Sequence, residues 1–261
     1  MHSFGATIYQ DNNFAIGYDV IKNQDNNFVI AGEKSSHFSW VLECSETEIN
    51  ITEFENDTLL QSSINAINEL ENGDLIFLGK IYSEVDLDNH NIYLRKTSHD
   101  GSLVWEQTLK RSLNDKGIDI LTNNDGNLLL CYEWKEGIIG TGIGVIEIDT
   151  DGNILKEKRI EEYKESLLGA KFHKTSDGGI LIAASQKINL AEVSNPITIK
   201  LDHTLDLKWS TQSGNMEYDQ FLNGAKELSN GDILVFGSST DECFEGTNIY
   251  IAKLSNIGEL K

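Results

Sequence analysis

The hydrophobic residues of this chain gather in five short apolar runs, each introduced by a turn of the Asn-Gly or Asp-Gly type. Counted from the turn residue that opens each unit, the steps between successive units are 47, 53, 52 and 53 residues. A period of about fifty residues with several strands in each unit is typical of a propeller blade. The five runs occupy residues 28–32, 75–79, 128–132, 180–184 and 233–237.

Each repeat is predicted to contain four strands. The first, as in residues 64–70, ends at the turn, where a tight hairpin needs positive φ and therefore Gly or Asn. The second is the apolar run, which is apolar on both faces and so is expected between neighbouring blades. A loop of variable length leads to the third strand, such as residues 91–96, and a second turn leads to the fourth. The fourth strand carries Trp105 or Trp209 in two repeats, and these rings are expected to pack on the next blade.

The two ends of the chain are complementary. The fifth repeat stops at residues 258–261, where its fourth strand should begin, and an unassigned apolar segment, Phe4–Tyr9, precedes the first repeat. Pairing this segment beside Ile249–Leu254 would close the ring and remove an exposed sheet edge. We therefore predict one all-β domain over residues 1–261, a five-bladed β-propeller of four-stranded antiparallel blades whose last blade is completed by the N-terminal strand. The repeats cover about residues 15–55, 63–110, 116–161, 167–214 and 221–261 plus 4–9.

Charge narrows the range of partners. The chain has 21 basic and 42 acidic residues, a net charge of −21, which disfavours nucleic acids and anionic membrane surfaces. Three cysteines do not form a disulfide framework. No segment has the length of a membrane span, and the first residues lack the features of a signal peptide. The sequence as written thus predicts a cytoplasmic location, or an extracellular one if a signal peptide has been removed.

The blade pattern resembles the β-propeller repeats of many exported bacterial proteins. Those repeats run from a strand through Asp-Gly-Gly or Asp-Gly-Asn, an apolar run, a polar loop and a strand ending in Lys-Leu-Asp to Gly and Trp. The clearest copy is residues 177–183 followed by Ile199–Asp202 and Trp209, and a second is residues 230–237 with Ala252–Leu254 and Gly258. The resemblance covers about 250 residues and implies the propeller fold. The matched positions are turns and core residues, so it implies no particular activity.

The loops between the second and third strands are the most divergent parts of the repeats, and function in propellers is expected on such a rim. They span roughly residues 33–39, 80–91, 133–142, 185–196 and 238–248. Four of them hold an aromatic residue, which could stack on a sugar or hold a peptide side chain, or could instead cover the edge of its own blade. These candidate binding residues are Phe38, Tyr82, Trp134 and Phe244, with Trp134 the first choice.

Two of these loops are acidic. Their candidate binding carboxylates are Asp86, Asp88, Asp241 and Glu242. Clustered carboxylates are oxygen ligands suited to Ca²⁺, and they could equally attract basic groups of a partner or remain solvated. The histidines lack zinc-binding spacing, and no phosphate-binding loop or nucleophile elbow is present. We therefore expect no resident cofactor, with Ca²⁺ as the ion to consider.

Two functional hypotheses follow. The leading one is a non-enzymatic module whose acidic, aromatic-bearing rim binds a protein, peptide or glycan, because the scaffold is complete and no catalytic set is evident. The alternative is a carbohydrate-active hydrolase or lyase with carboxylates at the mouth of the central channel. Its candidate acids are Asp19 and Asp119, which occupy equivalent positions of repeats one and three, and Lys171 stands at the same position of repeat four.

Overall fold

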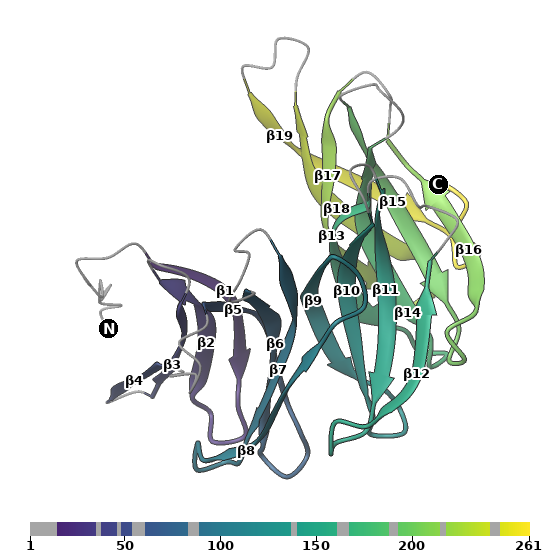
Figure 1. The fold of residues 1–261 in the computed structure, drawn as a ribbon. Helices are drawn as coiled ribbons and strands as arrows, with labels where there is room; N and C mark the ends of the chain where they lie inside the picture. Colours follow the sequence, from purple (N-terminus) through teal and green to yellow (C-terminus); the bar gives the residue numbers. More distant parts are fainter. Residues whose placement is uncertain are drawn as a thin grey trace, which may run out of the picture.

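The computed structural model contains only β-strands in the part of the chain that it describes. It describes residues 15–34, 38–45, 48–53, 61–82, 89–136, 140–160, 167–187, 193–214, 218–240 and 246–261. The strands form five separate antiparallel sheets, one for each predicted repeat, arranged about an axis as the blades of a propeller (Figure 1). The five-bladed all-β prediction is confirmed. No helix among the described residues is long and apolar enough to cross a membrane.

Four blades contain four strands in sequence order. Blade 1 comprises β1 (Ala15–Lys22), β2 (Phe28–Lys34), β3 (Phe38–Cys44) and β4 (Ile49–Glu53). Blade 2 comprises β5 (Ser62–Glu69), β6 (Leu75–Tyr82), β7 (His90–Thr97) and β8 (Leu103–Leu109). Blade 3 comprises β9 (Asn114–Thr122), β10 (Leu128–Glu136), β11 (Gly140–Ile148) and β12 (Ile154–Arg159). Blade 4 comprises β13 (Leu167–Lys174), β14 (Ile180–Lys187), β15 (Ser194–Leu201) and β16 (Leu207–Gln212).

Blade 5 has three strands among the described residues: β17 (Gln220–Glu227), β18 (Ile233–Thr240) and β19 (Thr247–Leu254). The C-terminal residues begin a further strand beside β19, because Leu260 bridges to Leu254 and the Lys261 amide donates to the Lys253 carbonyl over 2.9 Å. The predicted fourth strand, Phe4–Tyr9, lies outside the described residues. Each blade packs on the next, but the described strands of blades 1 and 5 do not pack together, and Figure 1 shows them apart.

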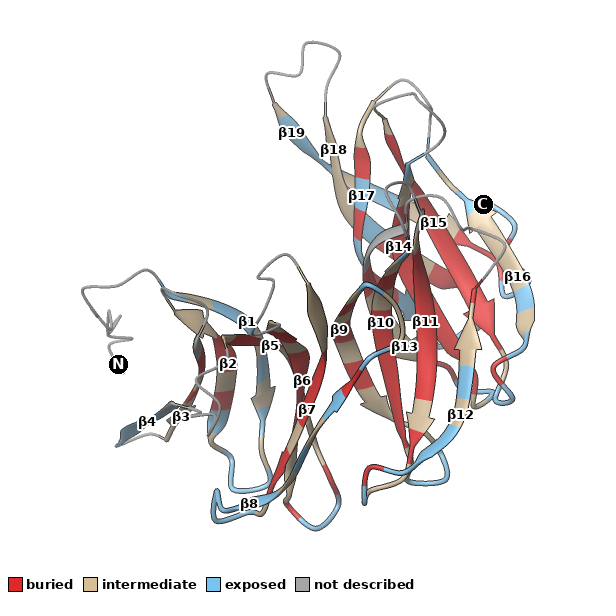
Figure 2. Cartoon of the chain, viewed as in Figure 1, coloured by how far each residue is buried: buried red, intermediate tan, exposed pale blue. Residues whose placement is uncertain are grey.

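The turns form as their sequences predict. Gly73, Gly126, Gly178 and Gly231 have φ between +81° and +84°, and Asn26 takes the same position in blade 1 with φ +66°. The apolar runs that follow make up the core, and Figure 2 shows burial concentrated in β5–β7, β9–β11, β14 and β15. The tryptophans of the outer strands reach the next blade, since Trp105 donates to the Thr150 carbonyl and Trp209 to the Asn256 carbonyl, both over 3.2 Å.

The innermost strand of every blade carries a β-bulge. The pairing register shifts between Gly17 and Asp19 in β1, and at the equivalent step of β5, β9 and β17. In β13 it shifts between Leu168 and Ala170, one residue further from the turn. A bulge adds one unpaired residue, bends the strand and can redirect a side chain. These inner strands pack against one another around the axis. The bulged positions, Tyr18, Asn65, Ile118, Gly169 and Asn223, therefore form a ring around the centre of the molecule.

Candidate functional site

A central cavity of about 220 Å³ lies where the inner strands of blades 1 to 4 converge. Three bulged residues, Tyr18, Asn65 and Ile118, form part of its wall. The bulge repeated in each blade thus contributes residues from distant parts of the sequence to one cavity. The remaining lining residues are Glu33, Ser63, Lys80, Lys116 and Lys171.

Asp19 and Asp119 follow two of the bulged residues and hold equivalent positions. The Asp19 carboxylate accepts hydrogen bonds from its neighbour Val20 and from the Ile67 amide of blade 2, each over 2.9 Å. The Asp119 carboxylate does the same with Ile120 over 3.0 Å and with the Phe172 amide of blade 4 over 2.8 Å. Each carboxylate therefore ties its blade to the next one. Each oxygen accepts one amide, so a second lone pair remains on it.

The charge of Asp19 affects the pKa of Asp119. Burial raises the pKa of Asp119, and the negative charge of Asp19 raises it further. Lys171 opposes this rise from 3.9 Å, as do the amide hydrogen bonds. A carboxyl group whose pKa is raised by burial and by a neighbouring negative charge has the environment typical of a general acid. Of the three residues that the sequence proposed for the channel mouth, Lys171 and Asp119 form an ion pair, and Asp19 acts on Asp119 through its charge.

A second group of residues adjoins the cavity on blade 2. The Tyr82 ring lies 5.9 Å from the ring of His90, and the Lys80 ammonium lies 4.6 Å from the centre of the Tyr82 ring. Burial, and after it the positive charges of Lys80 and Lys116, lower the pKa of His90 to about 4. His90 is therefore neutral at physiological pH. On blade 1, burial and then Glu33 raise the pKa of Tyr18 to about 12, so that phenol keeps its proton.

Trp134, the first choice among the rim aromatics, lies in the core of the molecule. It is only 4% exposed and packs in the apolar cluster between blades 2 and 3, while the Arg159 guanidinium lies 5.0 Å from its ring centre. Gly142 faces the indole from the partner strand and leaves room for it. Trp134 is buried because β10 and β11 run further than the sequence pattern indicated, so the expected loop of residues 133–142 is largely strand. Its ring is therefore not available to a ligand in this structure.

Most of the other residues expected on the rim lie outside the described part of the chain. Tyr82 is half-buried at the end of β6. The backbone of Phe38 begins β3, but its side chain, and Asp86, Asp88, Asp241, Glu242 and Phe244 entirely, lie outside the described residues. Within the described ranges, no group of three His, Cys, Asp or Glu residues is placed to hold a metal ion.

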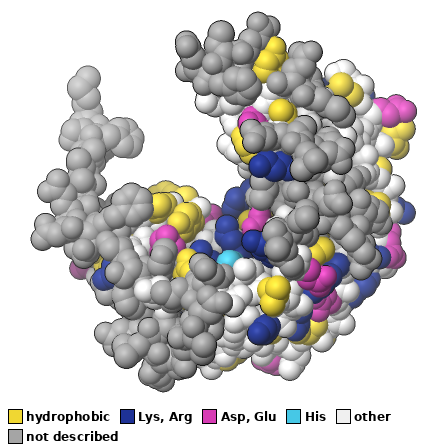
Figure 3. All heavy atoms as spheres, turned by 45° about the horizontal axis from the view of Figure 1, so that its top comes forward, with side chains coloured by type: hydrophobic (Ala, Val, Ile, Leu, Met, Phe, Trp, Pro, Cys, Tyr) yellow, Lys and Arg dark blue, Asp and Glu magenta, His cyan; other side chains and the backbone are white. Residues whose placement is uncertain are grey.

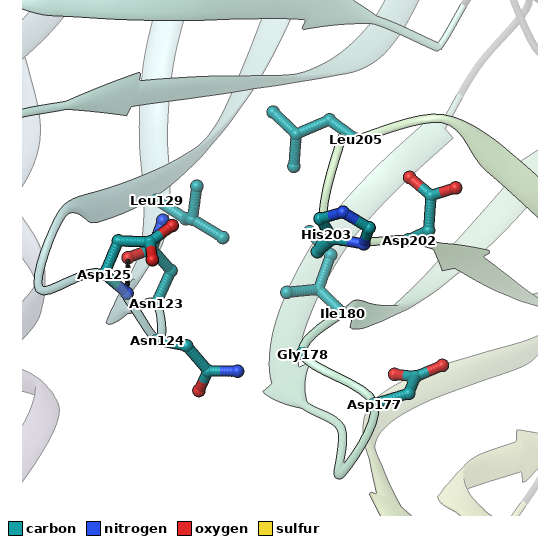
Figure 4. A pocket seen from close by; sticks show the side chains of 10 residues that line it. All are labelled: Asn123, Asn124, Asp125, Leu129, Asp177, Gly178, Ile180, Asp202, His203 and Leu205. Atoms are coloured by element: carbon teal, nitrogen blue, oxygen red, sulfur yellow. Dashed lines mark hydrogen bonds between the residues drawn. The ribbon is translucent and has the colours of Figure 1, made fainter.

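A larger cavity of about 290 Å³ lies between the turns of blades 3 and 4 (Figure 4). Leu129, Ile180 and Leu205 form its apolar part, and amide and acidic side chains surround it. Its acids already have internal partners: Asp177 lies 2.6 Å from the Lys200 ammonium, and Asp202 accepts from Thr204 over 2.6 Å. Because these contacts stabilise the turns themselves, we regard the central cavity as the better candidate site.

Sequence comparisons do not place the chain in a family: no family model matches it, and no curated protein does. Solved structures resemble it in fold. A putative exo-beta-1,3-galactanase from Bifidobacterium bifidum s17 is 14% identical, with a TM-score of 0.54 over 93% of this chain and 89% of that one. A thermostable family-43 glycoside hydrolase is 13% identical, with a TM-score of 0.52 over 93% and 91%. An ulvan lyase of polysaccharide lyase family 25, bound to a saccharide that contains GlcA, is 7% identical, with a TM-score of 0.61 over 93% and 64%.

These comparisons correct the leading functional hypothesis. The structural neighbours are glycoside hydrolases and a polysaccharide lyase, so the non-enzymatic binding module was the wrong main interpretation. At 7–14% identity, the likeness itself shows the shared propeller fold. The burial of Trp134 gives a physical reason, because it removes the strongest of the aromatic contacts on which the rim hypothesis rested. The expected protein and peptide partners gain no support, whereas a glycan partner accords with the neighbours.

Proposed function

We propose that this protein is a carbohydrate-active enzyme that cleaves glycosidic bonds at its central cavity. One observation carries the proposal: Asp19 and Asp119 hold equivalent positions of two blades, each directly after a bulged residue, Tyr18 or Ile118, that lines the central cavity. The fold alone requires no acid there, because the equivalent residues of blades 2, 4 and 5 are Ala66, Lys171 and Gly224. The glycan-cleaving neighbours support the same conclusion.

The proposed chemistry gives the two carboxyl groups different roles. Asp119, whose pKa is raised by burial and by Asp19, is the proton donor to the glycosidic oxygen as the bond to the sugar breaks. Asp19 is the second carboxylate, which either activates the water or attacks the sugar. Glycoside hydrolysis by such a pair uses carboxyl groups about 5–10 Å apart. Lys171 stabilises the carboxylate that forms on Asp119 after it has lost its proton.

The cavity wall supplies groups for holding a sugar. Tyr18 is 41% exposed and offers a ring face for stacking, while the Asn65 side-chain amide donates to the Gly117 carbonyl over 2.7 Å and is fixed in place. Stacking on an aromatic face combined with a few oriented polar groups is how sugar-sized ligands are usually held. A cavity of about 220 Å³ suits one sugar unit, with the rest of the chain outside.

We also propose that the chain is related to the β-propeller repeats of exported bacterial proteins. It is supported by the turn geometry, since the Gly or Asn of the first turn has positive φ in every blade. The test of this relationship is a related sequence that has both the same turn residues and aspartates at the positions of Asp19 and Asp119.

The test is the release of products from a panel of neutral and acidic glycans. Reducing ends report hydrolysis, and ultraviolet absorbance by unsaturated sugar ends reports a lyase. Asp119→Asn and Asp19→Asn are expected to lower the rate at least a hundredfold, because general acid–base catalysis contributes about 10²–10⁴-fold. Asp206→Asn, an exposed acid of the outer turn in blade 4, is the matched control.

The variants also lose hydrogen bonds between blades, so thermal unfolding must accompany the kinetics. The asparagine side chain keeps one oxygen acceptor, and the folded variants are expected to retain the glycan. Cleavage by well-folded Asp119→Asn at the wild-type rate, or no cleavage of any glycan by the wild type, would refute the proposal.

A further inference from the structure

Basic residues converge on the central cavity of a strongly acidic protein. Lys80, Lys116 and Lys171 line the cavity together with Glu33, and Asp19 and Asp119 of the proposed pair follow its lining residues Tyr18 and Ile118. The chain as a whole carries a net charge of −21. Figure 3 looks into the hollow of the molecule and shows dark blue Lys and Arg side chains gathered there around a His.

These lysines come from three different blades. Lys80 lies near the end of β6, Lys116 near the start of β9 and Lys171 in the middle of β13. No local sequence feature groups them, and only the packing of successive blades brings them to one place. A charge pattern assembled in this way points to an external ligand rather than to a local turn or cap.

The positive charges are only partly neutralised within the protein. Lys171 has Asp119 at 3.9 Å, but neither Lys80 nor Lys116 forms an ion pair with a described residue. Lys80 instead lies over the ring of Tyr82. Like charges held together in a hollow are unfavourable unless an anion joins them. The depressed pKa of His90, to which Lys80 and Lys116 contribute, reports the same positive potential.

A further polar group in the cavity wall lacks a partner. The hydroxyl of Ser63 is buried and makes no hydrogen bond, although Ser63 lines the cavity. A buried hydroxyl without a hydrogen-bond partner is unfavourable because it has lost its bonds to water. Together with the unpaired lysines, it indicates that the polar groups here are arranged for a ligand.

We propose that the central cavity selects acidic glycans, holding a carboxylate or sulfate group of the sugar between Lys80, Lys116 and Lys171. The inference rests on the proposed function and names its substrate class. Because the rest of the surface repels anions, the lysines must supply the whole attraction, and binding is expected to weaken as salt screens these charges.

The experiment measures affinity by isothermal titration calorimetry for three kinds of oligosaccharide of similar length: alginate, which carries carboxylates, sulfated dextran, and neutral dextran. The wild type is expected to bind at least one of the two acidic probes about tenfold or more tightly than the neutral one. Comparison of the two acidic probes shows whether the cavity prefers carboxylate or sulfate. Lys116→Gln and Lys80→Gln are each expected to lower affinity for the acidic probe about tenfold.

Lys110→Gln is the matched control, because Lys110 is exposed after β8 and away from the cavity. It should leave affinity unchanged. Preference for neutral dextran, or unchanged affinity in both cavity variants, would overturn this inference while leaving a glycan-cleaving function intact. Failure to bind any of the three probes, joined with failure to cleave any glycan, would overturn both.

Discussion

At the scale of single residues, two kinds of side-chain contact connect the third strand of a blade to its first turn. In blades 1 and 3, Glu43 and Glu147 accept hydrogen bonds from pairs of turn asparagines over 2.9–3.2 Å. In blades 2, 4 and 5, a lysine stands at that position and pairs with a turn aspartate, as Lys96 does with Asp74 over 3.1 Å. Turn and strand therefore vary together.

The turn glycines can be tested directly. Gly126 has φ +82°, and a Cβ added there would meet no atom within 4 Å, so only the backbone conformation opposes a side chain. Gly126→Ala is expected to lower the free energy of unfolding by about 1–2 kcal/mol. Chemical denaturation measures the change, with Asp125→Ala in the same turn as a control near zero. An equally stable Gly126→Ala protein would show that the turn does not hold this conformation.

A second residue-scale prediction concerns acid. Partial burial tends to raise the pKa of Asp177, but hydrogen bonds from Lys200 and Thr175 bring it down to about 2. The Thr204 hydroxyl is the main reason that the pKa of Asp202 is also about 2. Because these pKa values are lower in the folded chain than the ordinary 3.8, both groups stabilise it above about pH 4.

That stability should fall as the pH drops from about 4 towards 2 and both carboxylates take up protons. Thermal unfolding measured across this range checks the prediction. Asp177→Asn should flatten the profile, whereas a wild-type profile that stays level down to pH 2 would contradict it.

At the scale of elements, the lysine of the third strand also joins one blade to the next. Lys96 is buried, and its ammonium donates to the Thr150 carbonyl of blade 3 over 3.2 Å as well as pairing with Asp74. Lys96→Glu would place two carboxylates together in a buried site and is expected to cost about 3–5 kcal/mol of unfolding free energy. Lys110→Glu, on the exposed end of the outer strand, should cost under about 0.5 kcal/mol. Similar losses in both variants would rule out this role for Lys96.

The strands themselves follow largely from the sequence. The period of the apolar runs and the turn residues predict all five sheets, and the positive φ of Asn26 follows from its place in the repeat. The loops on the rim were harder to predict from the sequence, because β10 and β11 extend past the position of Trp134 and no turn residues mark where they end. An aromatic residue in such a hairpin has the same sequence signature whether it lies in the core or faces solvent.

The candidate site was only half predictable for a related reason. Asp19, Asp119 and Lys171 stand out because they occupy one repeat position, and a bulged residue precedes that position by one residue in blades 1 and 3 and by two in blade 4. Lys80 and Lys116 occupy unrelated positions of their repeats and meet only through the packing of blades. The sequence feature that could have pointed to them is the presence of lysines near the ends of the two inner strands of a blade, in a chain that is otherwise strongly acidic.

At the scale of the whole molecule, the two terminal blades leave apolar faces exposed. Ile249 and Ile251 of β19 are 82% and 63% exposed, whereas the equivalent Ile92 and Leu94 of blade 2 are fully buried. Val20 of blade 1 is 55% exposed, against 4% for its equivalent Ile67. Figure 3 shows hydrophobic side chains on both arms of the open hollow. In a closed propeller these are the faces that meet.

Closure of the ring therefore has a simple test. If blades 1 and 5 pack together in solution, Ile251→Glu buries a charge and should lower the unfolding free energy by about 3 kcal/mol or more. If the face stays exposed, the same change should cost under about 0.5 kcal/mol. Thr108→Glu on the exposed outer strand of blade 2 is the control. We expect the larger loss.

In the proposed function, the cavity on the propeller axis binds the sugar whose glycosidic bond is cleaved. A crystal structure of the Asp119→Asn variant with an acidic oligosaccharide would show the sugar directly. We expect a sugar ring stacked on Tyr18, its anionic group held by Lys80, Lys116 and Lys171, and its glycosidic oxygen next to position 119. A saccharide bound only on the outer blades, or between the turns around Asp177 and Asp202, would contradict it.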